Sequence, residues 1–409
     1  MKNVDVLVVG GGAAGFFAAI TCAETNPTLS VAILEKGSQF LAKVRISGGG
    51  RCNVTHSCFD PHQLIAFYPR GGPALLSAFL RFQPQDTIDW FEKRGVKLKT
   101  ESDGRIFPVT DSSRTIIDCL THAAKMTGVQ LMPNCEVCAI TCATSGKFLT
   151  SLSSGETLSC AKLMLATGGC RGIVAGKIAE SLGHSIVPPV PSLFTFQIAT
   201  TGLHELAGIS APEVAISVCN ARFKEKGPLL LTHSGLSGPA VLKLSARAAR
   251  ELHALNYQFS VRVNWLPDLA PEQLAKEFEK RRASQPARLV TNAPISPLPS
   301  RLWEALVKAS GIDPGARWSG FSRVDRHQLT QQLQFCELNV TGKSLNKDEF
   351  VTCGGVKLSE VNFKTMESKL CPGLFFGGEL LDIDGLTGGF NFQSAWTTGW
   401  IAGQSLAGG

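Results

Sequence analysis

Three glycines near the start of the chain have the spacing of a dinucleotide-binding turn. Gly10, Gly12 and Gly15 form the pattern G-x-G-x-x-G. In such a turn the first glycine permits a tight bend, the second lets the backbone approach a pyrophosphate, and the third lets a helix pack closely on a strand. Glu35 follows about 20 residues later, where a carboxylate accepts hydrogen bonds from both hydroxyls of an adenosine ribose. These residues predict a site for an adenine dinucleotide.

The elements around this pattern form one strand–helix–strand unit. Residues 4–9 are β-branched and almost continuously apolar, as in a parallel strand covered on both faces. Residues 13–24 have a helical pattern, and residues 29–34 are again typical of a buried strand. Further helical patterns occupy 74–94 and 115–127, and alternating strand patterns occupy 137–150 and 157–166. We therefore expect an α/β fold with a Rossmann-like domain.

The middle of the chain predicts a second, inserted part. Pro188, Pro189 and Pro191 have fixed φ angles and no amide donors, which predicts a semi-rigid connector and a domain boundary. Residues 192–265 contain short alternating segments, whereas residues 269–335 are helix-like and rich in Lys, Arg, Gln and Leu. The end of the chain is rich in Gly, Phe and Trp with few charges, so we expect it to pack on the first domain.

Composition narrows the class of protein. The chain has 409 residues, of which 44% are hydrophobic and 18% charged, and this balance excludes a disordered protein. The 40 Lys and Arg exceed the 33 Asp and Glu by seven, but no long basic run appears, so we expect no nucleic-acid partner. An odd number of 13 Cys, no signal pattern and no long apolar stretch predict a cytoplasmic protein with mostly free thiols.

Four segments in order make the chain similar to a known family. They are residues 45–55, 232–239, 351–356 and 378–403. On these segments the chain resembles the BaiN/YhiN-type flavoproteins, which are NAD(P)/FAD-dependent oxidoreductases, from residue 1 to about residue 405. The resemblance implies a Rossmann-like FAD-binding domain split in sequence, with an inserted small β-barrel-like domain and a helical subdomain. The expected ranges are 1–190 with 346–409 for the FAD domain, 191–268 with 331–345 for the barrel, and 269–330 for the helices.

The resemblance also implies where FAD would lie. Residues 10–15 would contact the pyrophosphate, Glu35 the ribose and the backbone of Val137 the adenine. The helix that begins near Phe390 would direct its amides at the pyrimidine end of the flavin, where a reduced flavin carries negative charge. The implied FAD-binding residues are Gly10, Gly12, Ala13, Ala14, Gly15, Glu35, Lys36, Lys43, Ser47, Gly49, Gly50, Arg51, Cys52, Asn53, Val137, Ala166, Thr167, Gly168, Gly378, Glu379, Gly388, Gly389, Phe390 and Asn391.

Three residues are candidates for contact with the substrate. The guanidinium groups of Arg51 and Arg105 could bind a carboxylate or an enone oxygen, or orient a proton donor. His233 lies in a Ser/Gly-rich loop of the insert, which we expect to cover the flavin. The predicted reaction takes hydride from NAD(P)H through flavin N5 to a small organic acceptor, a conjugated C=C or a quinone-like compound.

Other functions remain open at this point. Cys52 and Cys58 suggest a thiol–disulfide reductase, although five residues separate them and no second G-x-G-x-x-G follows for NAD(P)H. An FAD-dependent RNA-modifying enzyme and a non-enzymatic flavin-binding regulator are the remaining alternatives. Cys135 and Cys138 have a metal-like spacing, but residues three apart on a strand point to opposite faces, so we expect no metal site.

Overall fold

The computed structural model describes residues 2–143, 146–170, 173–199, 202–344 and 351–408. The chain divides into two compact units. The first unit combines Met1–Pro191 with Lys347–Gly409, and the second is Ser192–Asn346. The expected boundary between residues 345 and 346 lies outside the described residues. The first unit is thus built from both ends of the chain.

A nine-stranded sheet forms the centre of the first unit, and its middle strands are parallel in the order β20–β9–β1–β2–β6. Apolar side chains cover both faces of β1 and β2, which explains their continuous hydrophobic runs. Antiparallel strands extend the sheet at its sides. The strands are β1 (Lys2–Val9), β2 (Val31–Leu34), β6 (Gln130–Met132), β7 (Val137–Cys142), β8 (Phe148–Leu152), β9 (Thr157–Leu165), β18 (Val361–Asn362), β19 (Glu367–Ser368) and β20 (Leu374–Phe376).

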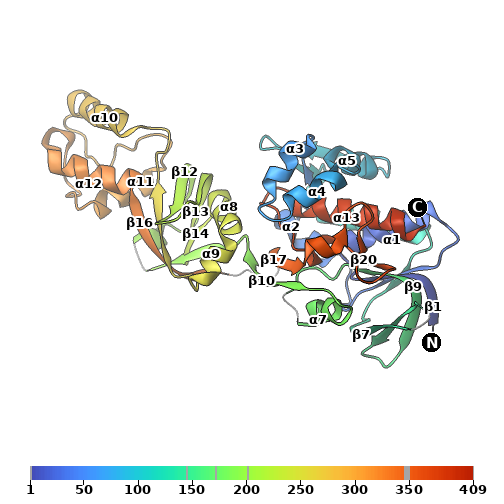
Figure 1. Cartoon of the computed structure of the whole chain (residues 1–409). Coiled ribbons are helices and arrows are strands. Elements are labelled where there is room, and N and C mark those ends of the chain that lie inside the picture. Colours follow the sequence, from blue (N-terminus) through green and yellow to red (C-terminus); the bar gives the residue numbers. More distant parts are fainter. Residues whose placement is uncertain (1, 144–145, 171–172, 200–201, 345–350, 409) are drawn as a thin grey trace. The chain divides into compact units, whose positions relative to one another are not determined.

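Two helices from opposite ends of the chain lie side by side on this sheet (Figure 1). They are α1 (Ala13–Thr25) and α13 (Phe390–Leu406). A Cβ atom at Gly399 would lie 2.5 Å from the carbonyl oxygen of Ala14, and one at Gly403 would lie 2.6 Å from that of Ala18. The two glycines therefore let the helix backbones touch, and the Gly-rich end of the chain packs on the first domain as expected.

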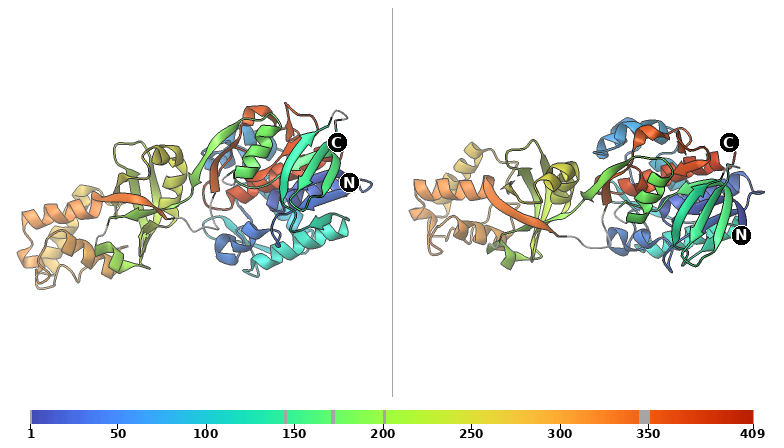
Figure 2. Two further views of the ribbon diagram at one scale, coloured as in Figure 1. Left: turned by 90° about the horizontal axis from the view of Figure 1, so that it is seen from below. Right: turned by 60° about the horizontal axis from the view of Figure 1, so that its bottom comes forward.

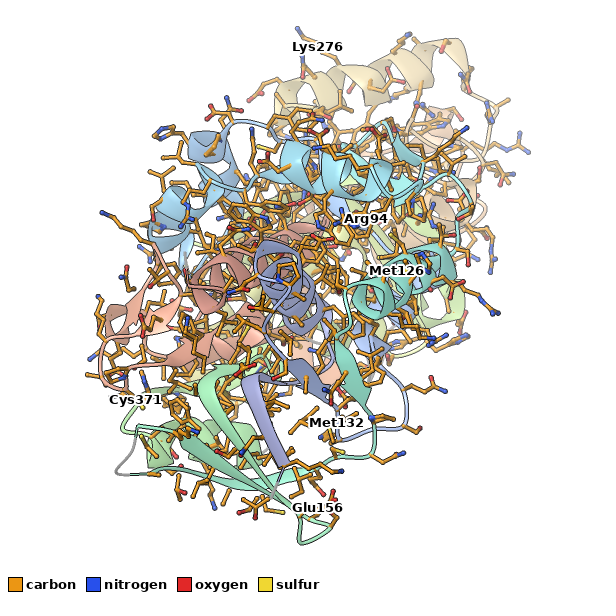
Figure 3. All side chains as sticks on the ribbon, turned by 90° about the vertical axis from the view of Figure 1, so that its right-hand side faces the viewer. Arg94, Met126, Met132, Glu156, Lys276 and Cys371 are labelled. Atoms are coloured by element: carbon orange, nitrogen blue, oxygen red, sulfur yellow. The ribbon has the colours of Figure 1, made fainter. Side chains whose placement is uncertain are left out.

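Five α-helices lie between β2 and β6 in sequence. They are α2 (Ala42–Gly50), α3 (Pro61–Leu64), α4 (Gly72–Phe79), α5 (Pro84–Glu92) and α6 (Ser113–Met126), with the short strands β3 (Thr55–His56), β4 (Leu98–Thr100) and β5 (Arg105–Pro108). The single helix expected at residues 74–94 is wrong, because α5 starts anew at Pro84. Asp86 accepts a hydrogen bond from the Gln83 amide at 2.8 Å and closes this new N-terminus. Figure 3 labels Met126, the exposed last residue of α6.

The proline-rich segment is a strand rather than a connector. Strand β10 (Ile186–Ser192) pairs with β17 (Val351–Val356) in a two-stranded sheet beyond α7 (Ile173–Ser181). Both strands are edges, so prolines that lack an amide donor are tolerated there. The division between the two units falls after Pro191.

The second unit is a closed six-stranded barrel with helices. The barrel order is β11–β14–β13–β12–β15–β16, and buried and exposed residues alternate along β16. Both views of Figure 2 show the helices of residues 271–334, coloured gold to orange, together at one end of this barrel. The elements are β11 (Thr195–Ile198), β12 (Ser210–Val218), β13 (Lys224–Thr232), β14 (Gly235–Ser237), α8 (Pro239–Arg247), α9 (Ala249–Ala254), β15 (Phe259–Asn264), α10 (Pro271–Ser284), α11 (Ser300–Ala309), α12 (Arg323–Gln334) and β16 (Cys336–Ser344). The predicted fold class is confirmed.

Membrane-spanning helices are not found in the part of the chain that the structure describes, since every helix there is too short or too polar.

Candidate functional site

The glycine turn connects β1 to α1, and its three glycines meet different surroundings. A Cβ atom at Gly10, where φ is +113°, would overlap the Ala166 carbonyl, and one at Gly15 would overlap the Gly10 carbonyl. A Cβ atom at Gly12 would meet nothing within 4 Å. Two of the glycines therefore serve packing, and the third faces open space.

The first turn of α1 is prepared to receive an anion. Gly12 is its N-cap residue, no side chain caps the helix, and no acidic residue lies in the first turn. The first N–H groups of a helix have no partner within the helix, and they carry partial positive charge. Ala13 and Ala14 offer these groups without bulky side chains, as a pyrophosphate site requires.

Glu35 is fixed beside this turn by two backbone amides. Its Oε2 accepts a hydrogen bond from Gly11 at 3.0 Å and its Oε1 accepts one from Gly37 at 2.9 Å. The amide of Cys135 donates to the carbonyl of Glu35 at 2.8 Å, so the chain leading to Val137 runs alongside. Each carboxylate oxygen keeps acceptor capacity for a ligand hydroxyl. The neighbouring Lys36 is exposed.

The residues that follow β9 lie next to the glycine turn. The amide of Ala166 donates to the carbonyl of Val9 at 2.8 Å. The Thr167 hydroxyl is buried and has no hydrogen-bond partner among the described residues, and a Cβ atom at Gly168 would meet nothing within 4 Å. A buried hydroxyl without a partner is unfavourable, so a ligand atom that bonds to it would stabilise this arrangement.

Gly378 and Glu379, which follow β20, contact residues of α13, β17 and α2. The amide of Gly378 donates to the Thr398 hydroxyl at 2.9 Å. Glu379 accepts a hydrogen bond from the Thr352 amide at 2.8 Å and forms an ion pair with Lys43. These contacts hold Lys43 and Glu379 together at the edge of the site.

The end of α2, from Ser47 into the loop that follows, has an unusual backbone that glycine permits. Helical geometry ends at Ser47, and residues 48–50 have φ between +58° and +84°. A Cβ atom at Gly49 or Gly50 would meet nothing within 4 Å, which leaves their backbone accessible. Asn53, in the amide orientation that satisfies its neighbours, donates to the Thr55 carbonyl at 3.0 Å and accepts from the Gly389 amide at 2.9 Å. The loop is thereby attached to the start of α13.

The N-terminus of α13, like that of α1, begins without a side-chain cap. Gly388 and Gly389 have φ values of +133° and +95°, and the first turn of α13 has neither a side-chain cap nor an acid. The Asn391 side chain holds Gly385 through two hydrogen bonds of 2.8 and 2.9 Å. The first N–H groups of α13 are therefore presented by a fixed loop.

An aromatic cluster supports this helix end. The ring of Phe390 stacks on Phe67 with centroids 4.3 Å apart and on His56 at 4.8 Å. The buried Tyr68 hydroxyl donates to the Phe390 carbonyl at 2.6 Å. The contribution of Phe390 to a ligand site is thus its backbone, since its side chain is buried in the cluster. No local pattern predicts the contact between Tyr68 and Phe390, since the two residues are 322 positions apart.

Arg51 and Arg105 lie together and share one carboxylate. Glu101 accepts from Arg51 at 2.7 Å and from Arg105 at 3.0 Å. The Arg51 guanidinium also stacks 4.0 Å above the Phe107 ring. The hydrogen bond to Glu101 raises the pKa of Arg51 above its ordinary value, so this group stays charged and can bind an oxygen atom but not supply a proton. His233 belongs to the second unit, exposed in the turn between β13 and β14.

The two cysteines of the thiol–disulfide alternative are free thiols. Cys52 is fully buried, and burial raises the pKa of its thiol to about 12. Burial also raises the pKa of the Cys58 thiol. A redox-active cysteine needs an accessible thiolate, and this environment disfavours it.

A buried ion pair near the loop before α13 was not predicted. Asp384 is fully buried and accepts two hydrogen bonds from Arg70, whose side chain is 16% exposed. The pair links the segment before α4 to the loop that leads into α13. The two residues are 314 positions apart in sequence, so no local pattern could indicate their contact.

Comparisons with known proteins agree with this fold. The chain is 32% identical to the ribosomal RNA dihydrouridine synthase of Escherichia coli (strain K12), over 99% of this chain and 98% of that one. It is 27% identical to the 3-dehydro-bile acid delta(4,6)-reductase of Clostridium scindens, over 98% of each. Among solved structures, the 3-ketosteroid-delta4-(5alpha)-dehydrogenase of Rhodococcus jostii RHA1 has a TM-score of 0.55 at 14% identity, over 99% of this chain and 97% of that one, which shows the fold.

The family model described as the HI0933-like protein Rossmann domain matches residues 4–405. The predicted flavoprotein oxidoreductase family is thus confirmed over nearly the whole chain. The chain belongs to the HI0933-like family of Rossmann-type FAD-dependent oxidoreductases.

Proposed function

We propose that this protein reduces a C=C bond conjugated to a carbonyl, with FAD as bound cofactor, and that its acceptor is a uridine of ribosomal RNA. Dihydrouridine is uridine whose C5=C6 bond, conjugated to the C4 carbonyl, has been saturated. The bile-acid relative is also named for reduction of double bonds near a keto group. The observation that carries the RNA substrate is the full-length similarity to the Escherichia coli synthase.

The residues of the first unit fit FAD. The open space at Gly12 and the uncapped start of α1 would receive the pyrophosphate, and Glu35 would accept hydrogen bonds from the ribose hydroxyls. The partnerless hydroxyl of Thr167 supports a ligand at the same edge of the sheet. FAD, when bound, would supply a hydride to the acceptor from its N5 atom, and solvent would supply the proton that completes saturation of the C=C bond. NAD(P)H is the proposed source of that hydride.

Several groups of the protein would act on the cofactor and the acceptor. The uncapped first turn of α13 would stabilise negative charge at the pyrimidine end of the flavin. The backbone of Gly49 and Gly50 would lie along the ring system, because no Cβ atom obstructs it. Arg51, kept charged by Glu101, would bind the carbonyl oxygen of the acceptor and draw electron density from the C=C bond. His233 is retained as a candidate substrate contact on the second unit.

The charge of the second unit favours RNA over a small acceptor. Residues 192–346 contain 18 Lys and Arg but 12 Asp and Glu, so six of the seven net positive charges of the chain lie there. No long basic run marks this excess in the sequence, and it becomes apparent only with the boundaries of the unit. A positive unit next in sequence to a flavin domain suits a polyanionic substrate.

The test is an anaerobic reduction followed by addition of acceptors. The flavin absorbance at about 450 nm should decrease when NADH or NADPH is added and recover when protein-free ribosomal RNA is added. The RNA is then digested and its nucleosides analysed by mass spectrometry for dihydrouridine. Recovery with a 4-en-3-one steroid but not with RNA would replace RNA by a small enone as the acceptor.

A matched pair of variants tests the role of Arg51. Arg51→Gln should raise KM for the acceptor and leave bleaching by NAD(P)H unchanged, because the guanidinium is proposed to contact the acceptor alone. Arg114→Gln serves as control, since Arg114 is 80% exposed and pairs with Asp118 on the same helix. An equal KM for Arg51→Gln and the wild-type protein would show that Arg51 does not contact the acceptor.

A further inference from the structure

The helices α10 and α12 of the second unit lie antiparallel. The Gln334 side chain, at the end of α12, donates to the Leu269 carbonyl just before α10 at 2.6 Å. Further along the pair, Arg326 contacts Glu279 at 2.9 Å. The C-terminal end of α10 therefore lies beside the N-terminal end of α12.

Four exposed arginines meet at this end of the helix pair, and we call them the arginine end. Arg282 lies in the last turn of α10, and Arg323 is the first residue of α12. Arg288 and Arg317 belong to two segments that run side by side, since the Trp318 amide donates to the Arg288 carbonyl at 3.1 Å. The segments that carry these four arginines thus lie at the same end of the helix pair.

Their charge is not neutralised by neighbouring acids. In the part of the chain that the structure describes, none of the four has a carboxylate within 4.0 Å. The acids nearby are engaged elsewhere: Glu277 pairs with Arg281, Glu279 pairs with Arg326, Asp313 accepts from the Gly315 amide, and Asp325 accepts from the Ser322 amide. The arginine end therefore keeps a local positive potential.

The guanidinium groups are oriented but keep free donors. Arg288 donates to the Gln285 side chain at 3.0 Å and to the Asn292 carbonyl at 2.6 Å, and Arg317 donates to the Ala287 carbonyl at 3.0 Å. A guanidinium has five N–H groups, so each retains donors that suit a phosphate. Such a surface would bind a nucleic-acid backbone whatever its sequence.

We infer that the arginine end binds the phosphate backbone of RNA and helps to dock the ribosomal RNA substrate. The inference rests on the proposed function, and it adds a contact surface that lies outside the flavin site. α10 also carries Lys276, which Figure 3 labels, and Lys280. Both lysines are exposed, one helical turn apart.

The test measures RNA binding by the full-length FAD-loaded protein. The probe is a fluorescein-labelled oligouridine of about 30 nucleotides, titrated at several salt concentrations. One variant replaces Arg282, Arg288, Arg317 and Arg323 with Gln. A matched control replaces four exposed cations of the first unit with Gln, namely Lys2, Arg114, Lys125 and Lys147, so both variants lose four positive charges. A third variant, Arg282→Glu with Arg323→Glu, leaves the backbone hydrogen bonds of the other two arginines intact.

The arginine variants should bind the probe about tenfold more weakly or worse at low salt. The slope of log K against log salt should become shallower by about 3 for the fourfold variant, since each single-strand phosphate contact contributes about 0.7. The control should keep the wild-type slope. Equal weakening in the control would mean that net charge alone acts, and unchanged binding in the arginine variants would equally overturn the inference.

Two further readouts separate this inference from the proposed function. If arginine-dependent RNA binding occurs but no uridine is reduced, the surface stands and the proposed substrate fails. If uridine is reduced equally by wild-type and arginine variants, the proposed function stands and the surface fails. Vesicles of phosphatidylserine and phosphatidylcholine provide the remaining arm: arginine-dependent binding to them without binding to RNA would assign the surface to a membrane and overturn the inference.

Discussion

Replacing Gly12 with alanine should separate cofactor binding from folding. Gly12 has φ of −92° and ψ of −168°, which alanine adopts freely, and its Cβ atom would meet nothing within 4 Å. Alanine restricts the unfolded chain, which adds about 0.4–1 kcal/mol of stability, but it is a poorer N-cap than glycine by a similar amount. We therefore expect the free energy of unfolding of the FAD-free protein to change by less than about 1 kcal/mol.

The effect on FAD should be much larger, because the new methyl group would occupy the space assigned to the pyrophosphate. We expect Kd to rise about 100-fold, which corresponds to about 2.8 kcal/mol. At an FAD concentration 100 times the wild-type Kd, bound FAD adds about 2.7 kcal/mol to wild-type stability. In Gly12→Ala the same concentration only equals Kd and adds about 0.4 kcal/mol.

Urea unfolding with and without FAD measures both effects, and quenching of FAD fluorescence gives Kd directly. Gly15→Ala is the matched control, because its Cβ atom would overlap the Gly10 carbonyl and should destabilise the FAD-free protein by about 1–3 kcal/mol or more. Wild-type Kd in Gly12→Ala would refute the placement of the pyrophosphate. Loss of stability in Gly12→Ala equal to that of the control would refute the reasoning about open space.

Three further outcomes are expected. Burial lowers the pKa of His184 below its ordinary value of 6.5. The neutral form of His184 therefore contributes stability that is complete above pH 6.5 and declines as the pH falls toward the pKa of His184 in the folded protein. Urea midpoints between about pH 5 and 8 should show this decline, and His184→Gln should reduce it. Gly399→Ala should lower the free energy of unfolding by about 1–3 kcal/mol in urea, because its Cβ atom would press on the Ala14 carbonyl of α1. The buried Cys52 should resist thiol reagents in the folded protein. Adding NAD(P)H should not change the number of thiols that react with such a reagent. A gain of two reactive thiols on reduction would restore the thiol–disulfide alternative.

Local patterns predicted the start of the fold well. The glycine turn, the first two strands and Glu35 occupy about 35 consecutive residues, and short-range sterics determine their arrangement. The expected helix over residues 74–94 failed because its apolar pattern continues across Pro84, while the proline and a capping box start a new helix there.

Contacts across long sequence separations were beyond such patterns. The hydrogen bond between Tyr68 and Phe390 joins residues 322 positions apart, and the ion pair of Arg70 with Asp384 joins residues 314 apart. In neither pair does the local sequence around one residue indicate which residue it contacts. The arginine end was missed for the same reason, because its four residues are scattered over two helices and two loops.

The split composition of the first unit has a consequence for biosynthesis. α1 is synthesised before the second unit, whereas α13, on which α1 packs, is synthesised after it. Ser192–Asn346 is synthesised before α13, so this segment can fold during translation while the first unit still lacks α13. The first unit can therefore be completed only after the second unit has been made, and a protein truncated before residue 390 would retain the glycine turn but lose the helix that packs beside α1.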